Sequence, residues 1–166
     1  LCSDSKDYQD NSAEIFYDLG DQKLKEGNYK SAIIDFNKAI DIDPNLIASY
    51  IGLGKAKNSL GDYHGAIDAF SKSIEIDSNY PDTYLLRAIA KGPVGDYQGA
   101  IEDCNKAIKI KPDNGINYFI RGLSKHFSGE KKAACEDWKK AAELGNKDAA
   151  GLLEEHCQSN NESAEK

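Results

Sequence analysis

The chain has 166 residues, enough for one domain with a real core, and its 40% hydrophobic and 30% charged residues are typical of a globular protein. Its formal charge of −7 argues against a nucleic-acid partner, because affinity for phosphates comes mainly from lysine and arginine. No apolar run approaches the roughly 18 residues of a membrane-spanning helix, so we expect no transmembrane segment. The chain begins at Leu1 and contains no methionine, so we expect a processed or trimmed form that an upstream targeting segment could have preceded.

Two polar stretches frame the periodic part of the chain. Residues 1–12 and 158–166 carry no apolar periodicity, and we expect both to be mobile tails. Residues 13–157 hold a regular apolar pattern, and they form the predicted domain.

The first predicted helix pair lies in 13–46. Its first helix ends at Gly27, and its second helix begins after Asn28, whose side-chain oxygen we expect to accept a backbone N–H. Pro44 stops the second helix, because proline cannot continue the backbone hydrogen bonds. The apolar residues at helical spacing are Phe16, Leu19, Gly20 and Leu24 in the first helix, and Ala32, Phe36, Ala39 and Ile40 in the second.

The same pattern recurs at steps of 34 residues. The matching positions are Ala32, Ala66, Ala100 and Ala134; Gly27, Gly61, Gly95 and Gly129; the caps Asn28, Asp62 and Asp96; and Phe36, Phe70, Cys104 and Trp138. The repeat divides the domain into units 13–46, 47–80, 81–114 and 115–148, with a single further helix in 147–157. Because one helix pair cannot bury its own apolar face, the units must stack.

The second unit carries the motif most completely, in Tyr50, Leu53, Gly54, Gly61, Asp62, Tyr63, Ala66 and Phe70. This pattern resembles the tetratricopeptide repeat (TPR) family, and the sequence of the motif is similar to that of bacterial members. The resemblance covers about residues 13–148 and implies an all-α, right-handed α-solenoid of four TPR helix pairs, closed by a C-terminal capping helix. The pattern departs at Ser78 and Asn146, which replace the closing proline, and at Arg87 and Arg121, which replace the usual leucine.

The resemblance also implies a concave binding groove along the first helix of each unit. The residues expected to line it are Tyr17, Asp21, Ile51, Lys55, Leu85, Ile89, Ile116, Phe119, Leu123 and Phe127. The groove becomes apolar toward the C-terminus, so we expect an amphipathic helix or an apolar peptide to dock there. The alternative is that the capping helix or a second copy of the protein fills this face. Pro93 should distort the end of its helix and widen the groove locally.

One activity found in the family is not expected. TPR co-chaperones that hold the C-terminal carboxylate of heat-shock chaperones use a clamp of Lys, Asn and Arg. Tyr17 and Asp21 stand at the equivalent positions of the first unit, and Asp21 would repel a carboxylate.

A lysine also recurs in every unit, as Lys23, Lys57, Lys91 and Lys125. These lysines either form a basic ladder that grips an acidic partner, or lie along their helices and pair with acids of the same unit. The second interpretation is favoured, since Asp35, Asp103 and Asp137 recur at a constant offset in three of the four units.

Signals of catalysis are missing from the sequence. It contains no phosphate-binding glycine loop, no nucleophile elbow and no zinc-protease motif. His64, His126 and His156 fall at unrelated places in the repeats, and His156 is expected to face solvent. We therefore expect no enzyme, no cofactor and no metal site.

The four cysteines divide into three kinds. Cys2 lies in the N-terminal tail and is a candidate lipid anchor, although Leu1 before it is a poor match to lipoprotein cleavage sites. Cys104 occupies a core position. Cys135 and Cys157 lie level across a helical hairpin that turns near Gly145, which favours a disulfide over two free core thiols.

The sequence as a whole predicts a protein–protein interaction scaffold or adaptor that binds a protein or peptide partner. The alternative is a self-associating module, a homo-oligomer whose groove holds another copy of the chain. A disulfide would place the protein in an oxidising compartment, so we expect an extracytoplasmic bacterial protein that is periplasmic, secreted or surface-anchored. A cytoplasmic location is the alternative.

Overall fold

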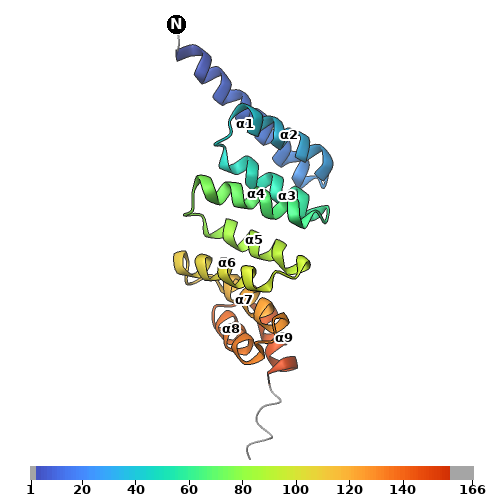
Figure 1. Ribbon diagram of the computed structural model, residues 1–166, viewed down its shortest axis with the longest axis vertical. Coiled ribbons are helices and arrows are strands. Elements are labelled where there is room, and N and C mark those ends of the chain that lie inside the picture. The colour runs from blue at the N-terminus through green and yellow to red at the C-terminus, as the bar shows by residue number, and fades with distance from the viewer. Residues whose placement is uncertain (1–2, 158–166) are drawn as a thin grey trace, which may run out of the picture. The chain divides into compact units, whose positions relative to one another are not determined.

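The computed structural model describes residues 3–157, with side chains from residue 12 onward, and every regular element in this range is helical (Figure 1). The elements are α1 (Ser3–Lys25), α2 (Tyr29–Ile42), α3 (Ile47–Ser59), α4 (Tyr63–Ile76), α5 (Pro81–Lys91), the 3₁₀ turn η1 (Gly92–Val94), α6 (Tyr97–Ile110), α7 (Gly115–Phe127), α8 (Lys131–Glu143) and α9 (Lys147–His156). The predicted all-α class is therefore confirmed. The C-terminal tail and Cys2 lie outside the described residues.

The helices belong to two compact units, which divide between Asn79 and Tyr80. In the first unit, each helix from α1 to α4 packs on the next, and α1 also contacts α3. In the second unit, the helices from α5 to α9 pack in the same consecutive way, and α5 contacts α7. Each unit thus contains two helix pairs stacked as in an α-solenoid, and α9 adds a single helix to the second unit (Figure 1).

The turn between the two helices of each pair contains a glycine in the left-handed region. At Gly61, for example, φ is 80°, a conformation that side chains with a Cβ rarely adopt. The following residue, Asp62, accepts a hydrogen bond from the Gly65 N–H at 3.0 Å and caps α4. The prediction that Asn28 caps α2 in this way is wrong, because its side chain makes no capping bond and its amide instead donates to Glu26 at 3.2 Å.

The structure also corrects the N-terminal boundary. Residues 3–12 were expected to belong to a tail, but they form the first turns of α1. This segment lacks an apolar face, yet it contains neither proline nor glycine. Extending a helix that has already formed costs far less than starting one, so α1 continues through this polar stretch.

The four repeated core positions are buried as expected, whereas Leu19 of the predicted apolar pattern is 41% exposed. Phe36, Phe70, Cys104 and Trp138 are each at most 1% exposed. Glycines on the first helices make room for these large side chains: a Cβ added at Gly54 would lie 2.5 Å from the Phe70 ring. The motif glycines and aromatics are therefore two halves of one packing contact.

The recurring lysines pair mostly within their own repeats, as the favoured interpretation predicts. Lys91 lies 2.9 Å from Asp103, and Lys125 lies 2.8 Å from Asp137. Lys23 pairs with Asp35 in the first repeat. All three aspartates are buried, and these ion pairs tie the two helices of a repeat together. The remaining lysine, Lys57, pairs only at 3.9 Å, with the exposed carboxylate of Asp62.

Candidate functional site

The second unit contains an apolar pocket of about 390 Å³ between α5 and α7. We call it the groove pocket. Its lining residues are Ala88, Ile89, Gly92, Pro93, Tyr97, Ile120, Leu123, Ser124 and Phe127. Three of these, Ile89, Leu123 and Phe127, belong to the predicted binding groove.

The end of α5 helps to form this pocket. The α-helix stops at Lys91 and tightens into the 3₁₀ turn Gly92–Val94, so the distortion predicted at Pro93 is present. Gly92 has no side chain to fill the space, and Pro93 presents only its ring. A long side chain at either position would occupy the volume that is open here.

The opposite wall comes from one face of α7. Ile120, Leu123 and Phe127 lie three and four residues apart, which places them on the same side of the helix. The Phe127 side chain is 63% exposed and stacks on the ring of Tyr97 with 5.6 Å between ring centroids. The hydroxyl of Ser124 donates to the Ile120 carbonyl at 2.9 Å, so the helix itself satisfies this polar group.

Other predicted groove residues of this unit lie elsewhere. Leu85 is 9% exposed and belongs to the core. Phe119 packs against the C-terminal apolar cluster of Ala134, Trp138, Ala141 and Ala149. Ile116 is exposed and borders a separate, mainly polar hollow where α7 and α9 begin. The predicted apolar strip is thus divided among the groove pocket, the core and the C-terminal cluster.

In the first unit, the predicted groove residues form no comparable apolar wall. Tyr17 lies against Phe36, and burial together with the nearby charge of Asp21 raises the pKa of its hydroxyl. The Asp21 carboxylate lies 2.6 Å from the Lys25 ammonium. Ile51 is half-buried and Lys55 is exposed.

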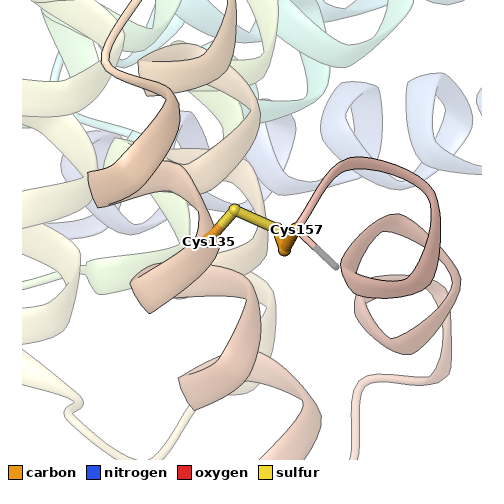
Figure 2. The surroundings of a disulfide bond; sticks show 2 residues. All are labelled: Cys135 and Cys157. Atoms are coloured by element: carbon orange, nitrogen blue, oxygen red, sulfur yellow. A yellow bond between two sulfur atoms is a disulfide. The ribbon is translucent and has the colours of Figure 1, made fainter. Parts of the chain in front are cut away.

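The C-terminal hairpin carries the predicted disulfide. Cys135 of α8 is bonded to Cys157, which directly follows α9, with 5.9 Å between their Cα atoms (Figure 2). The bond holds the end of α9 against α8, while Asn146 caps the start of α9 through the Ala149 N–H at 2.9 Å. Both ends of this closing helix are therefore fixed.

The histidine rings form a cluster that the sequence pattern did not reveal. The centroids of His126 and His156 lie 4.8 Å apart, and His156 lies 5.9 Å from the Trp138 ring. The expectation that His156 simply faces solvent is thus incomplete, because its side chain is 33% exposed but one side covers the core. The two histidines stand at unrelated repeat positions, and their rings meet only because α9 folds back on α8.

Cys104 is a buried free thiol in the second unit. Burial raises the pKa of the Cys104 thiol to about 12, so it stays protonated at neutral pH. Within the described residues, no group of three or more histidine, cysteine and acidic side chains could hold a metal ion. No helix in the same range is long and apolar enough to cross a membrane.

Comparison with known sequences agrees with this architecture. Models of the tetratricopeptide repeat match residues 13–46, 47–80 and 81–114. The chain belongs to the TPR family. The structure adds a fourth TPR helix pair, α7 and α8, and the repeats make the protein an interaction scaffold. No curated protein matches the chain.

Several solved TPR structures are similar to this chain. A crystal structure of MamA is 29% identical with a TM-score of 0.78, covering 84% of this chain and 82% of MamA. MamA from residue 41 of Desulfovibrio magneticus RS-1 is 17% identical with a TM-score of 0.77, covering 87% and 92%. The first TPR domain of Spaghetti (RPAP3), bound to the HSP90 peptide SRMEEVD, is 19% identical with a TM-score of 0.66, covering 72% and 93%. The last two likenesses concern the fold alone.

Proposed function

We propose that this TPR protein binds a partner polypeptide by taking one large apolar side chain into the groove pocket. The observation that carries the proposal is an open, apolar pocket of about 390 Å³, lined in part by residues that the TPR resemblance assigns to the binding groove. Burying an apolar side chain there would remove its surface and that of Phe127 from water, which favours association.

The partner segment is expected to be apolar at its anchor. Ile89, Leu123 and Phe127 offer no hydrogen-bonding groups, so a polar side chain would lose its water without compensation. A leucine or an aromatic residue suits this lining best. Flanking residues would lie along the neighbouring surface of α7 as a helix or an extended strand.

A peptide of the kind held by the RPAP3 domain is not the expected ligand. That HSP90 peptide is acidic and ends in Asp. The positions of this chain that a carboxylate clamp would use are Tyr17 and Asp21, and the Asp21 carboxylate already pairs with Lys25. The apolar pocket therefore supports a different class of partner.

Phe127→Ser tests the proposal directly. Peptides selected from a displayed random library on the wild-type chain should carry a leucine or aromatic anchor, and Phe127→Ser should weaken their binding about tenfold or more. Ile110→Ser is the matched control, because Ile110 is 43% exposed on α6 and does not line the pocket. Equal binding by wild type and Phe127→Ser would contradict the proposal.

Self-association through the groove is the competing outcome. In that case the mass measured by light scattering would rise with protein concentration without any peptide, and Phe127→Ser would abolish the rise. A constant monomeric mass together with peptide binding supports the adaptor function.

We further propose that the protein works in an oxidising compartment outside the bacterial cytoplasm. The Cys135–Cys157 disulfide supports this location, because such bonds persist mainly in secreted and periplasmic proteins. Mass spectrometry of protein from its native source, with and without reductant, would detect the bond. Finding both thiols free would contradict the proposed location, and the same spectra would reveal a lipid on Cys2.

A further inference from the structure

The second repeat lacks the buried carboxylate that neutralises the recurring lysine in the other three repeats. Asp35, Asp103 and Asp137 occupy one repeat position, and Ala69 occupies it in the second repeat. Lys57 therefore has no acid of its own repeat at the place where Lys91 finds Asp103. The ion pair of Lys57 with Asp62, at 3.9 Å, involves a carboxylate side chain that is 54% exposed.

The third repeat provides a comparison within the same molecule. Lys91 makes the equivalent weak pair with exposed Asp96 at 3.8 Å, but it also lies 2.9 Å from buried Asp103. Arg87 adds two hydrogen bonds to the same carboxylate, at 2.9 and 2.6 Å. Lys57 keeps the weak pair with an exposed aspartate, but it has no buried aspartate beside it.

The fourth repeat has the same complete arrangement. Asp137 lies 2.8 Å from Lys125 and accepts two hydrogen bonds from Arg121, whose guanidinium lies over the Tyr118 ring. In the second repeat, Leu53 replaces the arginine and Ala69 replaces the aspartate. Both substitutions remove side-chain volume and charge from the same place between the two helices.

A pocket of about 410 Å³ occupies this place in the second repeat. We call it the Ala69 pocket. It is lined by Tyr50, Leu53, Lys57, Gly65, Asp68, Ala69, Ser71, Lys72 and Glu75, all within the first unit. Its base is apolar at Leu53 and Ala69, and its wall includes two lysines and two acids, Lys57, Lys72, Asp68 and Glu75. The Lys72 ammonium already pairs with Glu75 at 2.7 Å, so Lys57 is the lysine that could receive a partner's carboxylate.

We infer that the Ala69 pocket is a binding site for an aspartate or glutamate side chain of a partner protein. The partner's carboxylate would take the place that Asp103 holds beside Lys91, next to the Lys57 ammonium. Its methylene groups would pack on Leu53 and Tyr50. The three sister repeats supply the charge complementarity, because each places a carboxylate beside its lysine in this position.

This site is separate from the groove pocket, which lies in the other unit, so either proposal can fail without the other. A partner that used both would present an apolar anchor to the second unit and an acidic side chain to the first. The recurring lysines therefore divide into two groups. Three pair with a buried aspartate of their own repeat, and Lys57 is available to an acidic group of a partner.

Blocked amino acids provide the probe. N-acetylglutamate amide should cause saturable shifts of the backbone amide signals around Lys57 and Ala69 in NMR spectra of the full chain. N-acetylglutamine amide has the same shape without the charge, and it should bind at least about tenfold more weakly, since a charged hydrogen-bonding partner is lost. Equal shifts with both probes, or no saturable shift with the glutamate probe, would overturn the proposal.

Two variants locate the effect. Ala69→Asp supplies the missing carboxylate from within the repeat and should abolish the shifts, while the midpoint of denaturant unfolding should not fall, since three sister repeats accommodate this aspartate. Lys57→Gln removes the charge at a partly exposed position and should abolish the shifts independently. Glutamate-dependent shifts that persist in either folded variant would show that the carboxylate binds elsewhere.

Discussion

The two ends of the described chain are built differently. At the C-terminal end, α9 covers the Trp138 cluster and is held by a cap, a disulfide and ring contacts. At the N-terminal end, α1 leaves Ile15 and Leu19 exposed by 51% and 41%. At the repeat position of Ile15, the later units have Ser49, Thr83 and Asn117, which are all buried. The comparison shows that one repeat position can be core or surface, depending on what packs upon it.

The largest expected effect is at the closed end. Trp138→Ala should lower the free energy of unfolding by about 3–5 kcal/mol, because it removes a fully buried ring and leaves a cavity against Gly122. Urea unfolding followed by circular dichroism would measure the loss. A loss below about 1 kcal/mol would mean that the C-terminal cluster is much looser than the structure indicates.

Breaking the disulfide should have the next largest effect. Replacing both Cys135 and Cys157 by serine opens a loop spanning a sequence separation of 22 residues, and the expected loss is about 3 kcal/mol. Hydrogen exchange should increase mainly in α9, while α1 to α4 keep the protection of the oxidised wild type. Unchanged exchange in α9 would show that its apolar contacts alone hold it in place.

Two asparagines that precede helices allow a matched comparison, Asn146 before α9 and Asn28 before α2. Asn146→Ala should cost about 1 kcal/mol, because its side chain accepts the Ala149 N–H at 2.9 Å. Asn28→Ala should cost much less, since Asn28 makes no capping bond. Thermal unfolding of the two variants would separate them, and equal losses would contradict the assigned capping geometry.

The smallest effect is expected at the open end. Ile15→Ser should change the free energy of unfolding of the dilute protein by no more than about 0.5 kcal/mol, because the side chain is half exposed. Urea unfolding would measure this change. A loss above about 2 kcal/mol that grows with protein concentration would mean that another molecule covers this face in solution.

The differences between prediction and structure have local physical causes. Asn28 has the right residue type for a cap, but its side-chain oxygen makes no capping bond, while its amide nitrogen donates to Glu26. Leu85 and Phe119 stand at groove positions, yet Leu85 is enclosed by the core and Phe119 packs against the C-terminal cluster. Residue type and spacing identify the candidates, and the packing of neighbouring helices selects among them.

The sequence by itself determined the class of fold, the four helix pairs, the glycine turns and the core positions, because each depends on spacing along one or two helices. It also favoured the Cys135–Cys157 disulfide over two free thiols, since the lengths of two helices and one turn place the cysteines level, and the structure contains the bond. Only the tertiary structure decided which groove residues remain open and that the histidine rings meet. It also decided that Ala69 leaves a pocket beside Lys57. These features depend on how side chains from several helices pack together, and a pattern within one or two helices does not predict that packing.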